Sequence, residues 1–351
     1  MKRVYRAVSL VAAAALAAGL VLIQRNNKET KLYETKFFDS FDTVTSISGY
    51  AASQEEFESQ TKLLQEKLQY YHRLFDIYHT YDGINNIKTI NDAAGAEAVK
   101  VDREIVELLK LGKEMYQKTE GRLHIAYGSV LSVWHAYREQ GMQEPKQAAL
   151  PPEELLQEKA QYTDISNLIV DEEKSTVFLK EQEMSLDVGS IGKGYAVQRL
   201  AEYAREIGME HALISVGGNV CAVGTKKDGT PWRIGIENPD LESDESYVGV
   251  VEMADQSIVT SGDYQRFYLV NGKRYCHIIN PGTGMPSEYF PSVSVQTKDS
   301  GMADALSTAL FNMEFEEGLE FVESLPGVEA LWILKDGDIR CSGGFEFHEK
   351  K

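Results

Sequence analysis

Seven short runs rich in β-branched and aromatic residues follow one another in the second half of this chain, and they constrain its fold more than any other feature. Only two stretches with helical spacing interrupt them, at about residues 192–207 and 301–313. Asn271-Gly272 predicts a two-residue hairpin turn between one run and a further strand over Arg274–Ile278. A regular βαβ series would need a helix between successive strands, so the pattern predicts an α+β fold with antiparallel hairpins. The runs are Leu168–Val170, Thr176–Leu179, Ala212–Ser215, Trp232–Ile236, Tyr247–Met253, Phe267–Val270 and Ser292–Gln296.

The first half of the chain reads differently, with one strand and two long helices. Phe37–Ile47 alternates and is rich in Thr, Phe and Val, which predicts a strand. Glu55–Leu74 and Asp102–Thr119 carry apolar residues at helical spacing, and Asp102 is placed to cap the second helix. Residues 136–158 are polar and contain three prolines, which indicates an insertion or a subdomain boundary.

The N-terminus has the pattern of an export signal. Lys2, Arg3 and Arg6 precede an apolar run from Ala7 to Ile23, whose length lies between a signal-peptide core and a membrane span. We therefore expect residues 1–25 to be a cleaved signal peptide or an N-terminal membrane anchor, with a buried helix as the alternative. Residues 26–36 are polar and charged and are predicted to be a tether. The chain is expected at the extracytoplasmic face of the cell membrane.

The charge of the chain excludes one class of partner. With 36 Lys and Arg against 54 Asp and Glu, the formal net charge is −18, and the first 25 residues contain no acid at all. Nucleic-acid binding requires a basic surface that neutralises phosphates, so no nucleic-acid partner is expected. The same acidity conflicts at first sight with two glycine-rich turns, near residues 187–194 and 217–218, because such turns favour a phosphate ligand.

Two glycine-rich turns are the first candidates for such a ligand. Asp187 is followed by Gly189, Gly192 and Gly194 as a helix begins, and backbone amides at a helix N-terminus attract phosphate. Lys193 adds a full positive charge. Gly217-Gly218 breaks a second strand and permits close approach of the backbone. Turn geometry or packing explains either feature equally well when it is taken alone.

His277 and an acidic helix face are the other candidates. His277 ends a hairpin strand before the Asn-Pro-Gly-Thr-Gly turn, where an imidazole can act as a general base. Asp304 and Thr308 are four residues apart, so they share one face of a helix. A carboxylate and a hydroxyl there can contribute to a hard oxygen site for Mg²⁺. The alternatives are a structural histidine, and an aspartate that caps the helix.

These motifs, in this order and after an export signal, resemble the ApbE family of FAD:protein FMN transferases. The resemblance covers about Phe37 to Ile339. It implies a T-fold-related architecture, with two lobes of mixed and antiparallel sheet and packed helices around an FAD cleft, within a transferase domain over residues 37–345. The matching motifs are Phe41-Asp42-Thr43, Ile90-Asn91, the loop 187–195, Gly217-Gly218-Asn219, the stretch 260–264, the stretch 277–286 and Ala303-Asp304 with Thr308.

The resemblance also implies a reaction, in which the FMN half of FAD passes to a Thr or Ser hydroxyl of a partner flavoprotein and AMP is released. Mg²⁺ would be the cofactor and FAD the substrate. His277 is then the expected base. The metal ligands would be Asp304, Thr308 and a backbone oxygen near Ser190. The contacts to FAD would be Phe41, Tyr81, Asp187, Lys193 and Ile278, with Tyr78 as the alternative to Tyr81.

Two other functions stay open, a pyrophosphatase because the same metal site would serve it, and a binding protein because of a departure from the family pattern. Leu123-His124 stands where the family often has Phe-Asp, which places a flavin or nucleotide contact in question. An FAD pyrophosphatase that gives FMN and AMP would use water as the acceptor. A non-catalytic flavin-binding protein outside the cytoplasm would bind FAD without transfer.

Overall fold

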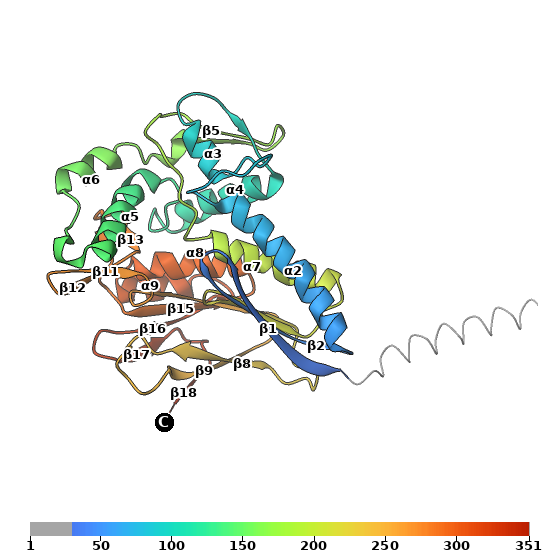
Figure 1. Ribbon diagram of the computed structural model, residues 1–351. Helices are drawn as coiled ribbons and strands as arrows, with labels where there is room; N and C mark the ends of the chain where they lie inside the picture. Colours follow the sequence, from blue (N-terminus) through green and yellow to red (C-terminus); the bar gives the residue numbers. More distant parts are fainter. Residues whose placement is uncertain (1–29, 351) are drawn as a thin grey trace, which may run out of the picture.

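An eight-stranded antiparallel sheet forms the centre of the protein in the computed structural model, which describes residues 30–350 (Figure 1). Neighbouring strands are joined through hydrogen-bonded ladders that all run antiparallel. The predicted α+β class is confirmed. In spatial order the strands are β1 (Lys31–Ser40), β2 (Thr43–Ala51), β6 (Ala212–Val216), β7 (Asn219–Val223), β10 (Ser257–Gly262), β15 (Ser292–Thr297), β16 (Glu329–Ile333) and β17 (Ile339–Cys341).

The two faces of this sheet are covered by different layers. Helices α2 (Gln54–Phe75), α7 (Gly192–Glu206) and α8 (Ser300–Phe311) lie on one face, and a three-stranded sheet of β8, β9 and β18 lies on the other (Figure 1). Successive side chains of a strand point to opposite faces. Accordingly Val259 packs into the helical core, while its neighbour Ile258 packs beneath the small sheet. The strands of the small sheet are β8 (Trp232–Glu237), β9 (Tyr247–Met253) and β18 (Phe347–Glu349).

A second body of helices and short hairpins stands above the helical layer in Figure 1. Part of it has a separate apolar cluster, which joins Trp134 of α5 to Tyr268 of β11, so the β11–β12 hairpin packs against α5. Helix α4 and strand β5 instead pack into the main core, through Leu108 and Leu179. The elements are α3 (Ile87–Asp92), α4 (Arg103–Lys118), α5 (Gly128–Gln143), α6 (Glu153–Ala160), β3 (Val99–Lys100), β4 (Leu168–Asp171), β5 (Thr176–Leu179), β11 (Phe267–Val270), β12 (Lys273–Cys276), β13 (Ile279–Asn280) and β14 (Met285–Pro286). Helix α9 (Phe315–Glu323) leads from α8 into β16.

The four predicted helices and the predicted hairpin turn are present. The Asp102 side chain caps α4 by accepting from the Glu104 N–H at 2.9 Å. Asn271 and Gly272 have φ values of 52° and 80°, as a two-residue turn of this type requires. Val270 and Lys273 pair across it.

Three expectations need correction in extent. The strand predicted over Phe37–Ile47 is a hairpin of β1 and β2 that turns at Phe41-Asp42. Residues 31–36 of the predicted tether 26–36 belong to β1, because Tyr33 and Phe37 alternate toward α2, and Tyr33 stacks on Phe57 at 5.6 Å. The proline-bearing stretch 136–158 contains the end of α5 and most of α6.

The predicted leader, residues 1–25, lies outside the described residues, as does the first part of the tether. Within residues 30–350 we find no helix that is both long and apolar enough to cross a membrane.

Candidate functional site

One cavity of about 640 Å³ lies where the central sheet, its helical layer and the second body meet. This volume is within the range typical of small-molecule sites. All of the residues predicted from the sequence to form a site line it, although they come from five separate parts of the chain. They are Phe41, Tyr81, Asp187, Ser190, Lys193, His277, Ile278, Asp304 and Thr308.

Two adjacent hairpin turns form one edge of the cavity. Phe41 and Asp42 turn β1 into β2 with φ values of 56° and 50°, a left-handed conformation that is unfavourable for residues other than glycine. Gly217 and Gly218 turn β6 into β7. A Cβ on Gly217 would lie 2.6 Å from the Thr43 hydroxyl oxygen, so glycine is required for the two turns to touch. Strain of this kind, at Phe41 and Asp42, is typical of functional sites.

The crossing of α7 and α8 forms the floor of the site. A Cβ on Gly194 would lie 2.3 Å from the Ser300 carbonyl oxygen and 2.4 Å from the Asp304 Cβ, so only glycine permits this approach. At this contact the Gly194 N–H donates to Asp304 Oδ2 at 2.7 Å. The first turn of α7 therefore supplies an N–H that fixes the orientation of the buried carboxylate.

Asp304 is the most buried charged group of the site, with 4% of its surface exposed. Burial raises the pKa of its carboxyl overall, although the charge of Lys193, the Gly194 N–H and the Asn219 side chain act to lower it. A buried carboxylate with one oxygen committed to an N–H leaves its other oxygen available to a cation. Thr308 follows one turn later on the same helix and also lines the cavity.

This donor set fits Mg²⁺, which prefers carboxylate, hydroxyl and carbonyl oxygens and retains waters or substrate phosphates. Asp304 and Thr308 would be the side-chain ligands, and the backbone near Ser190 is the further contributor predicted above. Within residues 30–350 there is no group of three or more His, Cys, Asp or Glu side chains that could hold a metal alone.

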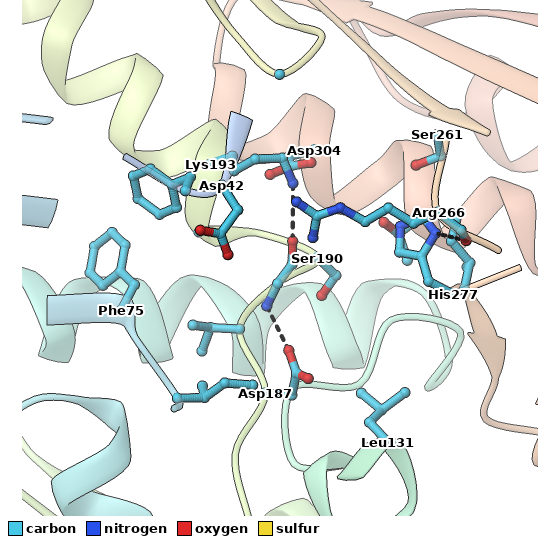
Figure 2. Close-up of a pocket in the computed structure, with 18 of the residues that line it drawn as sticks. Asp42, Phe75, Leu131, Asp187, Ser190, Lys193, Ser261, Arg266, His277 and Asp304 are labelled. Atoms are coloured by element: carbon cyan, nitrogen blue, oxygen red, sulfur yellow. Dashed lines mark hydrogen bonds between the residues drawn. The ribbon is translucent and has the colours of Figure 1, made fainter. Parts of the chain in front are cut away.

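Asp187 of the loop before α7 and Lys193 of its first turn lie on the cavity wall. Asp187 Oδ1 accepts from the Gly189 N–H at 2.8 Å, and Lys193 Nζ lies 3.5 Å from the Gly189 carbonyl (Figure 2). On its other side Asp187 Oδ2 is 3.7 Å from His135 Nε2, and His135 Nδ1 is 3.1 Å from the Tyr78 hydroxyl. This chain joins three separate elements, so the Asp187 carboxylate is held from both sides.

Asp76 organises a second stretch of the wall, next to the Tyr78 side chain. Its carboxylate accepts from the Tyr81 hydroxyl at 2.7 Å, from the Tyr78 N–H at 2.7 Å and from His79. Burial raises the pKa of Asp76, but these hydrogen bonds outweigh it and the pKa is lowered overall. Asp76 therefore stays ionised and fixes Tyr81 at the cavity.

His277 stands at the opposite side, at the end of β12. Its Nδ1 lies 3.2 Å from the Arg266 carbonyl (Figure 2), and a carbonyl can only accept, so Nδ1 carries the proton. Nε2 then keeps its lone pair. Burial and the charges of Arg266, Lys193 and Arg138 lower the pKa of His277 to about 3. The imidazole is therefore neutral near pH 7, with the Nε2 lone pair directed away from the Arg266 carbonyl.

Comparison with known proteins decides the family. The model of the ApbE family matches residues 41–332, which is most of the chain. The chain belongs to the ApbE family. It is 32% identical to the FAD:protein FMN transferase of Treponema pallidum over 272 residues, 74% of this chain and 73% of that protein. It is 29% identical to the FAD:protein FMN transferase of Klebsiella pneumoniae over 282 residues, 77% and 84% of the two chains.

Solved structures of ApbE proteins share the fold. The crystal structure of the ApbE protein from Thermotoga maritima superposes with a TM-score of 0.77 at 29% identity, covering 89% of this chain and 97% of that chain. The flavin transferase ApbE from Vibrio cholerae gives a TM-score of 0.76 at 26% identity, covering 90% and 99%. The match to the ApbE architecture therefore extends over nearly the whole described chain.

Leu123 and His124, which stand where Phe-Asp was expected from the resemblance to the ApbE family, have different environments. Leu123 is fully buried in the core, so it contributes packing rather than a ligand contact. His124 lines the cavity between Tyr116, at 4.6 Å between ring centroids, and Tyr127, at 5.5 Å. Burial lowers the pKa of His124 to about 4, so the ring is neutral where the ApbE family often has a carboxylate.

Several further polar residues line this ApbE cavity without a role predicted from the sequence, and four of them are Asp42, His135, Arg138 and Arg266. Asp42 lay inside a recognised motif, but the turn that aims it at the cavity was read as continuous strand. The other three carry no motif signal. They reach the cavity because α5 packs against the β11–β12 hairpin, a tertiary contact that no local pattern encodes.

Proposed function

We propose that this chain is an FAD:protein FMN transferase, which moves the FMN half of FAD to a Thr or Ser hydroxyl of a partner flavoprotein and releases AMP. The observation that carries the proposal is the convergence of Asp304, Lys193 and His277 on one cavity in a member of the ApbE family. A cation-binding carboxylate, a phosphate-binding lysine and a neutral imidazole are the groups that such a transfer needs.

In this mechanism His277 acts as the general base. Nε2 takes the proton of the acceptor hydroxyl, because Nδ1 is already committed to the Arg266 carbonyl. The hydroxyl oxygen then attacks the FMN phosphorus, and the bond from that phosphorus to the AMP oxygen breaks. General-base catalysis typically contributes about 10²–10⁴-fold.

The remaining residues hold the substrate. Lys193 and the amides of the loop before α7 would bind the pyrophosphate, while Phe41, Tyr81, Asp187 and Ile278 would contact the rest of FAD. Asp304, Thr308 and the backbone near Ser190 would hold Mg²⁺. When bound, the ion would neutralise pyrophosphate charge and stabilise the leaving AMP.

The experiment that tests the proposal is a mass measurement on the acceptor. The chain from residue 30 onward is incubated with FAD, Mg²⁺ and a flavoprotein domain encoded beside it, and the acceptor is then weighed. A gain of one FMN per acceptor, lost on replacing its Thr or Ser by Ala, is expected. Free FMN and AMP at full rate without any acceptor would instead identify a pyrophosphatase, and bound FAD without turnover would identify a binding protein.

We also propose that the leader places this domain at the extracytoplasmic face of the membrane. The support is the basic cluster at Lys2, Arg3 and Arg6 before the apolar run Ala7–Ile23. Expression of the full chain, followed by fractionation and N-terminal sequencing, separates a retained anchor from a cleaved signal. Recovery of the intact chain in the cytosolic fraction would refute the proposal.

A further inference from the structure

Arg266 and His277 lie opposite each other just beyond the β11–β12 ladder. Phe267 pairs with Cys276, so Arg266 and His277 are the next cross-strand pair, and the His277 N–H donates to the Arg266 carbonyl at 3.0 Å. Directly opposite residues of an antiparallel pair extend from the same face. Both residues line the cavity, and in Figure 2 the Arg266 side chain extends toward the side that holds Lys193 and Asp304.

The guanidinium of Arg266 has no hydrogen-bond or ion-pair partner within the described part of the chain. Two other arginines nearby are paired: Arg274 lies 3.3 Å from Asp263, and Arg122 lies 2.8 Å from Glu317. Among the described residues Arg138, which also lines the cavity, is unpaired like Arg266. A guanidinium presents five N–H donors in a planar fork that matches phosphate oxygens. An unpaired one that faces the cavity of an acidic protein therefore indicates an anionic ligand.

The charges of the proposed reaction identify the anion. FAD brings two negative charges on its pyrophosphate, and Lys193, Asp304 and a divalent ion would together balance them. Removal of the acceptor proton by His277 then adds one negative charge to the reacting atoms. The same step leaves a positive charge on the His277 imidazole, so the negative charge on the reacting oxygens would be stabilised by a cation that reaches them from another side. Arg266 extends toward the side of the cavity that holds Lys193 and Asp304 (Figure 2).

We propose that Arg266 is a further catalytic residue of the FMN transfer. Its guanidinium binds the pyrophosphate oxygens of FAD and stabilises the charge that develops as the acceptor oxygen bonds to the FMN phosphorus. The bond to the AMP oxygen breaks with its electron pair leaving on AMP, and the acceptor proton goes to His277 Nε2. The carbonyl of the same residue fixes the His277 tautomer. This inference rests on the proposed function.

The two roles of Arg266 can be separated, because any substitution keeps the carbonyl. Arg266→Gln should lower kcat for FMN transfer by about 10²–10³-fold, the loss typical when one preorganised transition-state donor is removed. Arg266→Lys should recover part of the rate. Added methylguanidine should stimulate Arg266→Gln and leave the wild-type rate unchanged.

The pH profile distinguishes this role from a structural one. Removing the cation opposite His277 removes one cause that holds its pKa down, so the acidic limb of kcat/KM should move to higher pH in Arg266→Gln. Arg274→Gln is the matched control, because it makes the same charge change on the same hairpin. Its exposed ion pair with Asp263 is worth little, so transfer should stay within about fivefold of wild type.

Binding of ADP with Mg²⁺, measured by calorimetry, tests the anion contact without the transfer reaction. Wild type should bind, and Arg266→Gln should bind at least about tenfold more weakly, as expected for the loss of a charged hydrogen-bond partner. The inference is overturned if wild type transfers FMN and Arg266→Gln transfers within threefold of it, or if ADP affinity is unchanged. A wild type that binds ADP but never modifies an acceptor would instead refute the proposed function.

Discussion

The two sides of the cavity are held in place by different means. On one side Gly194 lets α7 and α8 meet, and Asp304 is buried in that contact with its orientation fixed by a backbone N–H. On the other side His277 directly follows the four-residue strand β12, whose hairpin packs on α5, and its neighbour Arg266 is exposed. The carboxylate is thus fixed by helix packing, whereas the base is fixed by one carbonyl, at an edge open to a second protein. Four predictions examine this difference.

The largest effect is expected at the buried side, from Asp304→Asn. The amide oxygen can still accept from the Gly194 N–H, but the charge that would hold the cation is lost. Loss of the bound cation would remove several kcal/mol of transition-state stabilisation. The rate of FMN transfer, measured at saturating FAD and Mg²⁺, should therefore fall about 10³-fold. Folding stability should not fall, because the substitution removes a desolvated charge.

Asp299→Asn is the matched control for this change. The substitution makes the same chemical change at the start of the same helix. The Asp299 side chain caps the N-terminus of α8 by accepting from the Met302 N–H at 2.8 Å. Asp299→Asn should leave the transfer rate intact. Equal activity of Asp304→Asn and Asp299→Asn would show that the buried carboxylate has no role in transfer.

At the hairpin side, His277→Ala should lower transfer by about 10²–10⁴-fold while FAD still binds. The side chain lines the cavity without supporting the core, so the unfolding midpoint should change little. Flavin fluorescence measures FAD binding, and acceptor mass measures transfer. His211, whose Nδ1 contacts the Thr225 carbonyl, supplies a control histidine in His211→Ala. Survival of activity in His277→Ala would refute the assignment of the base.

Gly194→Ala examines whether helix packing really fixes the carboxylate. The added Cβ would lie 2.3 Å from a backbone oxygen, so α7 and α8 must separate, at a cost of about 1–3 kcal/mol in unfolding free energy. Transfer should fall as well, because Asp304 loses its N–H partner. Gly318→Ala in α9 meets only side-chain atoms of Leu310 and Trp332, at 3.3 Å and 3.5 Å, and should cost much less. Similar urea midpoints for the two variants would contradict a packing requirement at Gly194.

Much of the buried side was predictable from the sequence, because glycine spacing and helical periodicity are local signals. The Asp304–Thr308 face and the start of α7 followed from such patterns, and the Asn271-Gly272 turn followed from its residue types. Phe41-Asp42 was not seen as a turn, since the residues expected at positive φ are glycine and asparagine.

The hairpin side was harder to predict because its geometry depends on tertiary contacts. Arg266 and His277 become neighbours only through the register of β11 and β12, and His135 approaches Asp187 only because α5 packs on that hairpin. Residues 31–36 were also hard to predict from the sequence. Their polar and charged side chains are typical of a tether, and only the contact with α2 favours a strand there.

The smallest effect concerns pH and stability, and it belongs to the hairpin side. The folded pKa of His277 is about 3, whereas an unfolded histidine has a pKa near 6.5. The unfolded chain therefore binds a proton as the pH falls below about 6.5, while the folded chain does not until near pH 3. His277 should thus contribute stability that is present above pH 6.5 and is lost as the pH falls toward 3. Between pH 6.5 and pH 5, urea unfolding should show a loss of stability that is about 1.6 kcal/mol larger in wild type than in His277→Gln. His124, with a pKa of about 4, adds a separate loss of the same sign, which His277→Gln should leave in place. If the pH slope is identical in wild type and His277→Gln, the surrounding residues do not hold the imidazole neutral. The protonation state of His277 would then be set by the bound substrate.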